Sequence, residues 1–242
     1  MTHIGAIWVY LAASPLLGLT LTLFAYLFAQ AVYARSNYNP SANPVLIAVA
    51  VIVTVLVLTG TPYPTYFQGA QFVHFLLGPA TVALALPLYR QLPKLRRAAL
   101  PLAGGLVAGS LTAIVSATGI AMLFGVPRAT VVSLAPKSAT TPIAMAIAER
   151  LGGLPSLTAV LVIFTGVFGA VSARTILNAL RIDEAEVRGF ALGVASHGIG
   201  TARAFQLSDE MGAFAGLGMG LNGLFTAFVV PVLLPIALRW YG

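Results

Sequence analysis

The 242-residue chain is 59% hydrophobic and 8% charged, with a mean hydropathy of +0.94, which excludes an ordinary soluble globular domain. It has no Cys, which excludes a disulfide framework, a Cys-ligated metal and a thiol nucleophile. The net charge of +7 does not indicate a nucleic-acid partner, because the basic residues cluster at the ends of hydrophobic segments, as membrane topology requires. We therefore expect a single integral membrane domain over residues 1–242.

Hydrophobic segments follow one another along the chain, and several approach the ~20 residues that cross a hydrocarbon core. The first has no Lys or Arg before Arg35 and is too long for the apolar part of a signal peptide, so we expect it to be the first span. Strand-like alternation is missing, which predicts an all-α, polytopic membrane protein with about seven or eight helical segments. We expect residues 1–70 to form a scaffold and interface, and residues 71–242 to form the core. The segments are Ile7–Tyr33, Pro44–Gly60, Phe72–Tyr89, Ala99–Gly125, Ala129–Ala148, Leu157–Leu180, Gly189–Leu207 and Ala213–Trp240.

Three segments contain helix-breaking residues, at Gly78-Pro79, Pro136–Pro142 and Ser196–Gly200. The breaks recur about every 60 residues, and repeated Gly/Pro-interrupted segments are typical of transporter binding sites. The sequence therefore predicts repeated, interrupted helices whose breaks approach one another near mid-membrane. The alternative is that Pro and Gly only kink these helices or allow close packing.

The short loop after the third segment is strongly basic and is expected to lie in the cytoplasm. Its basic residues are Arg90, Lys94, Arg96 and Arg97. If the loop Arg181–Arg188 is also cytoplasmic, the segment around Lys137 forms a re-entrant hairpin rather than a full crossing.

Lys137 is the one charge between Arg128 and Glu149. A lysine at membrane depth costs roughly 2.5–3.5 kcal/mol on insertion scales, so it needs a partner or a wet cavity. Pro136 and Pro142 bracket it and remove backbone donors, and broken backbone is tolerated where it lines a cavity. Hydroxyls accompany the cation, which predicts a site for a small oxygen-rich anion. They belong to Ser138, Thr140 and Thr141.

The third break adds polar groups to this predicted site. His197 and Arg203 offer positive charge, and Gly198 and Gly200 let backbone N–H groups approach a ligand. Helix N-termini after the breaks add favourable dipoles, and His197 is suited to couple proton movement to transport. The predicted substrate-binding residues are Lys137, Ser138, Thr140, Thr141, Ser196, His197, Gly198, Gly200, Thr201 and Arg203, with Pro79 and Thr81 from the first break. Purely structural roles remain open as alternatives. His197 then bonds a carbonyl, Arg203 extends to the membrane–water interface, and the hydroxyls of Thr140 and Thr141 bond back to their own helix.

Enzymatic chemistry is not indicated, and we expect no catalytic residues, metal or cofactor. All six acids lie at or after Glu149, and none is at the centre of a span, so paired buried carboxylates are not visible. Ser196-His197 does not make a hydrolase pair, because adjacent residues seldom point at each other on a helix. Three scattered histidines do not predict a metal site.

Three stretches of the chain resemble the LrgB/CidB family of antiholin-like proteins, also described as murein hydrolase export regulators. They are FLLGPATVALALPLYRQLP (Phe75–Pro93), LAPKSATTPIAMAIAERLGGLPSLTAV (Leu134–Val160) and RGFALGVASHGIGTARAFQLSDEMGAFAGLGMGLNGLFTA (Arg188–Ala227). With the spacing between them, the resemblance covers the chain from about Asn43 to its end.

This resemblance implies two functions of different classes. Plastid relatives are similar to a glycolate/glycerate translocator, and bacterial relatives are associated with pyruvate uptake. The first expectation is therefore a transporter of short 2-hydroxy or 2-oxo monocarboxylates such as glycolate, glycerate, pyruvate or lactate, working by alternating access and coupled to protons. The second is a holin-like or antiholin-like pore or scaffold that modulates murein hydrolase activity and lysis, beside a small holin-like partner. We expect a homodimer in the inner membrane of a bacterium, because Gly-rich helices favour close association.

Overall fold

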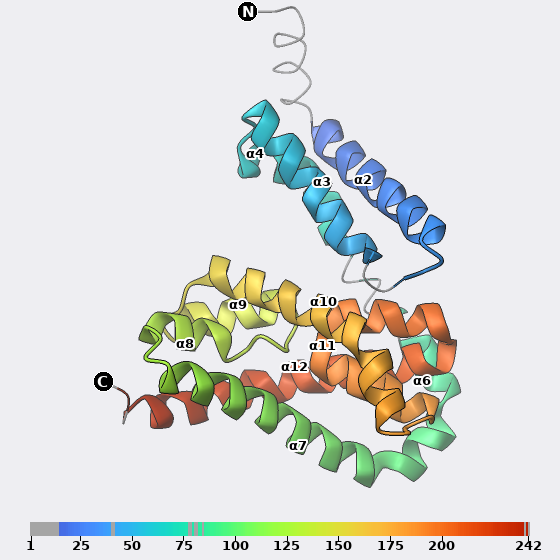
Figure 1. Ribbon diagram of the computed structural model, residues 1–242, viewed down its shortest axis with the longest axis vertical. Helices are drawn as coiled ribbons and strands as arrows, with labels where there is room; N and C mark the ends of the chain where they lie inside the picture. The colour runs from blue at the N-terminus through green and yellow to red at the C-terminus, as the bar shows by residue number, and fades with distance from the viewer. Residues whose placement is uncertain are drawn as a thin grey trace, which may run out of the picture. The chain divides into compact units, whose positions relative to one another are not determined.

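The computed structural model describes residues 15–39, 42–76, 79, 82–83, 85–239 and 241, and within these ranges the regular secondary structure is helical. The expectation of an all-α protein is confirmed. The helices are α2 (Pro15–Arg35), α3 (Pro44–Thr59), α4 (Tyr63–Phe75), α6 (Ala85–Arg90), α7 (Leu92–Leu123), α8 (Arg128–Leu134), α9 (Thr141–Arg150), α10 (Pro155–Ala179), α11 (Ala185–Leu207) and α12 (Asp209–Leu238) (Figure 1).

Four of the described helices, α2, α7, α10 and α12, are long and apolar enough to cross a membrane. At 1.5 Å per residue, the 30 residues of α12 extend about 45 Å, which exceeds the ~30 Å of a hydrocarbon core. The chain is thus a membrane protein by length and composition of its helices. The other predicted segments correspond to helices that are not among these four: α3, α4 with α6, α8 with α9, and α11.

Local sequence signals explain where α3 begins and ends. The Asn43 side chain accepts hydrogen bonds from the backbone N–H groups of Val45 and Leu46, and Pro44 opens the helix without losing an intrahelical bond. Gly60 ends the helix in the left-handed conformation, with φ of 64°. The bounds of the predicted segment, Pro44–Gly60, coincide with these two signals.

The chain divides into two compact units, Met1–Ala83 and Leu84–Gly242. In the first unit α2 packs against α3 and α4. Gly18 lets α2 approach α4 closely, because an added Cβ would overlap the carbonyl oxygen of Tyr66. A 2.8 Å hydrogen bond between the hydroxyls of Thr22 and Tyr66 joins the same two helices.

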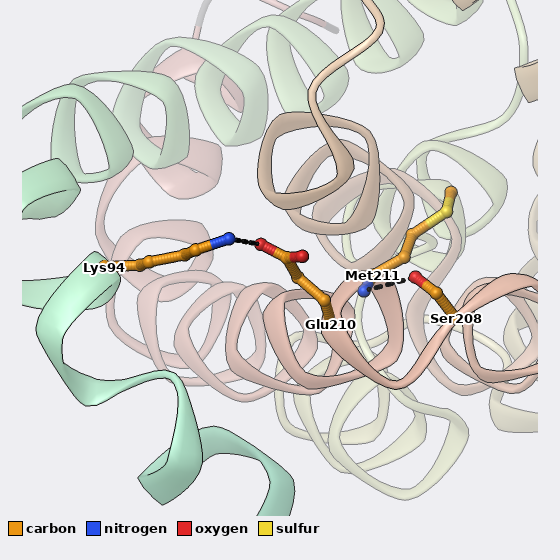
Figure 2. A network of polar contacts seen from close by, with 4 residues as sticks. All are labelled: Lys94, Ser208, Glu210 and Met211. Atoms are coloured by element: carbon orange, nitrogen blue, oxygen red, sulfur yellow. Dashed lines mark hydrogen bonds and ion pairs between the residues drawn. The ribbon is translucent and has the colours of Figure 1, made fainter.

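In the second unit the N-terminal ends of α7 and α12 are tied together by an ion pair between Lys94 and Glu210 (Figure 2). Ser208 caps α12, because its Oγ accepts a 3.1 Å hydrogen bond from the backbone N–H of Met211. Asp209 and Glu210 occupy the first turn of α12, where acids are favourable.

The predicted basic loop is helical rather than irregular. α7 begins at Leu92, so Lys94, Arg96 and Arg97 lie in its first turns. Lysine and arginine have good helix propensity, and a proline within the first turn is tolerated, so charge alone does not end a helix here.

Helix α11 doubles back on itself at His197, which has non-helical φ of 42° and ψ of −133°. Added Cβ atoms at Gly189 and Gly193 would overlap the carbonyl oxygens of Met211 and Ala215, so the first half of α11 runs parallel to α12. In the second half of α11, Phe205 lies against Gly212. Gly212 is the neighbour of Met211 on α12, so Phe205 and Gly189 contact the same part of that helix. The two halves of α11 therefore flank the same stretch of α12 in opposite directions.

The turn of α11 lies partway along α12. Thr201 Oγ1 lies 3.8 Å from the sulfur of Met219, and Met219 is ten residues after Asp209, about 15 Å along the helix axis. At the other end of this unit, α8 packs on the C-terminal parts of α7 and α12 through Val131, Val132 and Leu234 (Figure 1). The connection from α8 to α9 thus approaches the turn of α11 from the opposite end of α12.

Candidate functional site

A cavity of about 880 Å³ lies in the second unit, between α7, α10, the first half of α11 and the connection from α8 to α9. We call it the central cavity. Most of its walls are apolar side chains and glycines, and Lys137 contributes the one formal charge of the described lining. The polar residues of this lining are Lys137, Ser138, Thr165, Ser172 and Ser196.

Two prolines place Lys137 outside regular helix. α8 ends at Leu134, and the backbone N–H of Lys137 donates to the Leu134 carbonyl in a turn at 3.2 Å. Pro136 removes a backbone donor at this point, and Pro142 lies in the first turn of α9. Lys137 Nζ lies 3.5 Å from Ser138 Oγ, and no carboxylate of the described residues pairs with it. Lys137 therefore lines the cavity without a counter-ion among the described residues.

Asn222 of α12 holds the Lys137 connection in place. It is 1% exposed, and its Nδ2 donates a 2.9 Å hydrogen bond to the carbonyl of Ser138. Its Oδ1 accepts a 2.6 Å hydrogen bond from Ser110 Oγ of α7. One buried amide thus joins α7, α12 and the turn that carries Lys137. Sequence reasoning missed it, although an asparagine within an apolar helix was a signal that could have found it.

Replacing Asn222 with leucine is expected to destabilise the protein by about 2–4 kcal/mol, because the Ser138 carbonyl and the Ser110 hydroxyl lose their buried partner. The measurement is the apparent melting temperature in detergent. The matched control is Asn178→Leu, since Asn178 is an exposed amide that accepts a hydrogen bond from Arg188. Equal melting temperatures for the two variants would contradict the structural role of Asn222.

The turn of α11 brings Ser196 and His197 against α10. An added Cβ at Gly169 would overlap Ser196 Oγ, and one at Gly166 would lie 2.7 Å from the His197 ring, so both glycines are needed for this approach. His197 Nε2 lies 2.9 Å from the Val162 carbonyl, which only accepts, so Nε2 carries the proton. Ser196 is 1% exposed, and its Oγ is a buried polar atom of the described residues without a hydrogen-bond partner.

The predicted site residues fall into three groups. Lys137, Ser138 and Ser196 line the central cavity. His197 and Thr201 are buried beside it, with Thr201 Oγ1 donating a 2.8 Å hydrogen bond to the His197 carbonyl.

The remaining predicted residues are absent from the described lining of the cavity. Thr140 is the residue before α9, Thr141 begins α9, and Gly200 packs near the Leu192 carbonyl. A Cβ added at Gly198 would lie 3.9 Å from the sulfur of Met219. The guanidinium of Arg203 donates a 3.2 Å hydrogen bond to Gln206 Oε1. Pro79 is exposed in the first unit, while Gly78 and Thr81 lie outside the described residues.

The family model described as LrgB-like family matches residues 22–236, which cover most of each unit and the whole described lining of the central cavity. The chain belongs to the LrgB-like family. The resemblance predicted from the sequence is therefore confirmed. No solved structure matches the chain.

Relatives of this LrgB-like chain carry three kinds of name. It is 38% identical over 219 residues to a Bacillus subtilis (strain 168) protein named uncharacterized protein YwbG, covering 90% of this chain and 97% of that protein. It is 31% identical over 214 residues to the holin-like protein CidB of Staphylococcus epidermidis (strain ATCC 12228 / FDA PCI 1200), covering 88% and 93%. It is 29% identical over 222 residues to the antiholin-like protein LrgB of Bacillus mycoides (strain KBAB4), covering 92% and 96%. The second and third of these names describe holin-like and antiholin-like proteins.

Proposed function

We propose that this LrgB-like chain is a holin-like or antiholin-like membrane protein that modulates murein hydrolase activity and lysis. The observation that carries the proposal is the family match over residues 22–236, with relatives named holin-like and antiholin-like along almost their whole length. The four helices able to cross a membrane are consistent with a protein that acts within the bilayer. The cytoplasmic membrane of a bacterium is the proposed location.

Controlled expression in a bacterial host lacking its own family members tests this function. We expect production of the chain to change both the lysis rate and the murein hydrolase activity of the culture, measured by turbidity and by zymography. The control is a Gly193→Ala variant at matched membrane levels, because this change disrupts the packing of α11 on α12. Unchanged lysis and unchanged hydrolase activity at full membrane expression would contradict the proposal.

A second candidate function is a carrier for short 2-hydroxy or 2-oxo monocarboxylates. Lys137 favours it, because this residue lines the central cavity and has no acidic partner among the described residues. The turn of α11 and the Lys137 connection approach from opposite ends of α12, and interrupted segments meeting near mid-membrane are typical of alternating-access transporters. His197 is the proposed proton-coupling residue, and its ring bonds a backbone carbonyl beside the cavity.

Uptake into proteoliposomes tests the carrier. Labelled glycolate, glycerate, pyruvate and lactate are offered with and without an inward proton gradient. Saturable uptake that rises with the gradient supports a proton-coupled carrier. Uptake equal to that of empty liposomes for all four acids would rule this candidate out and leave the holin-like function.

We also propose that the chain assembles as a homodimer and associates with a small holin-like membrane protein. Its exposed apolar residues on the long helices, including Val115, Ile120 and Phe228, lie outside the described lining of the central cavity and are suited to lipid or to a second copy. Native mass spectrometry from nanodiscs measures both assemblies. A monomer in several mild detergents and in nanodiscs would count against the dimer.

A further inference from the structure

We infer that the central cavity binds a single-chain amphipathic monocarboxylate, such as a medium-chain fatty acid, with its carboxylate at Lys137 and its alkyl chain along the apolar walls. This inference goes beyond both candidate functions, because binding is measured directly and does not require lysis or transport.

The size and lining of the cavity favour this ligand over a short hydroxy acid. About 880 Å³ lies within the 300–1,000 Å³ of sites for drug-sized ligands, and it far exceeds a two- or three-carbon acid. A short hydroxy acid also needs partners for its hydroxyls. Thr165 and Ser172 line the cavity, but their hydroxyls already donate to the carbonyls of Leu161 and Phe168 at 2.7 Å.

The uncommitted polar groups gather in one part of the cavity. Ser138 lies at the level of Ser110 in α7, because Asn222 bonds both residues. Ser196 follows Val194, whose Cγ1 would lie 3.4 Å from a Cβ added at Gly109. Lys137 and Ser196 both line the cavity, and the contacts of their neighbours place this part of the lining near Gly109 and Ser110 of α7. Ser196 Oγ packs against Gly169 of α10, so a carboxylate at this level is held by Lys137, whose ammonium donates a charge-assisted hydrogen bond to it.

From this polar level the lining continues as apolar surface. It runs along α7 from Gly109 to Pro101, eight residues or roughly 12 Å at 1.5 Å per residue. Phe190 of α11 covers this part, 3.9 Å from a Cβ added at Gly105, and Leu102 and Val187 line it as well. A polar level with one cation, followed by an extended apolar slot, is complementary to one carboxylate on one alkyl chain.

Photolabelling of the purified full chain in nanodiscs tests the inference. The probe is decanoate with a diazirine at the end of its alkyl chain, and labelled peptides are identified by mass spectrometry. We expect labels on the Leu102–Gly105 stretch of α7 and around Phe190. Unlabelled fatty acids should compete better as their chain lengthens from butyrate to decanoate, by up to about four-fold per methylene.

Two variants and an ester separate binding of the carboxylate from partitioning into lipid. Lys137→Met should reduce labelling by the acid at least about ten-fold. The methyl ester of the same probe should label the parent weakly and be unaffected by this change. Lys94→Met is the matched control, because Lys94 pairs with Glu210 outside the cavity lining.

Three results would overturn the inference. The first is labelling spread over exposed residues such as Val115 and Ile120, which lie outside the described lining. The second is equal labelling by acid and ester in the parent. The third is stronger competition by glycolate, pyruvate or a two-chain phosphatidylglycerol than by decanoate, which assigns the cavity to a different ligand. A normal lysis phenotype without photolabelling would reject this ligand while leaving the holin-like function standing.

Discussion

Replacing Gly193 with alanine is expected to destabilise the protein by about 3 kcal/mol, because an added Cβ would overlap the backbone carbonyl oxygen of Ala215. A backbone atom within a packed helix cannot move aside as a side chain does, so α11 and α12 must separate. For a chain of this size, such a loss lowers the melting temperature by about 6–12 °C. The measurement is thermal loss of the monodisperse peak in size-exclusion chromatography.

The chain offers a matched control for this glycine effect. A Cβ added at Gly220, in the same pair of packed helices, meets nothing within 4 Å. Gly220→Ala should leave the melting temperature unchanged or raise it slightly, because alanine is favoured over glycine inside helices by roughly 0.5–1 kcal/mol. Equal losses in the two variants would mean that the close approach of α11 to α12 does not stabilise the fold.

Lys137→Met is expected to weaken carboxylate binding, and any carboxylate uptake, by about 10- to 150-fold. The basis is the roughly 1.5–3 kcal/mol of a hydrogen bond to a charged group, at about 1.4 kcal/mol per tenfold. Methionine keeps the volume of the side chain and removes its charge. Folding should survive, because the substitution removes a charge that has no carboxylate partner among the described residues. Binding isotherms and initial uptake rates at matched reconstitution measure the effect.

An arginine at the same position sharpens this experiment. Lys137→Arg should restore binding only in part, because a planar guanidinium does not occupy the space of a compact ammonium beside Ser138. A Lys137→Met protein that binds and transports like the parent would show that Lys137 is structural, and it would remove the carboxylate site from the central cavity.

Local signals in the sequence predicted much of the architecture. Hydropathy alone indicated the helical membrane class, and the caps at Asn43, Gly60 and Ser208 mark helix ends by chemistry within a few residues. Lys137 was recognisable because a charge in an apolar run is costly. The start of α7 was placed too late, since Lys94 and its basic neighbours were taken as a loop although they are good helix formers.

The contacts between helices could not be predicted from local signals. Asn222 was missed because its role depends on Ser138 and Ser110, which are distant in sequence. Gly166 and Gly169 gave no local sign that Ser196 and His197 would pack against them. Sequence rules would also assign the positive φ of the α11 turn to Gly198 or Gly200, yet His197 adopts it, held by its hydrogen bond to Val162.

The position of Asn222 along α12 also has an electrical consequence. Asn222 lies 13 residues from Asp209 and 16 from Leu238, close to the middle of the helix, and it fixes the Ser138 carbonyl beside Lys137. If α12 crosses the bilayer, an anion at Lys137 has traversed about half of the transmembrane potential. A full crossing by one charge is worth about 2.3 kcal/mol per 100 mV. Half of a crossing therefore changes the apparent affinity for the anion by about seven-fold for each 100 mV of membrane potential. An anion bound at this level therefore senses the energised state of the membrane through its own charge, without a dedicated voltage-sensing helix.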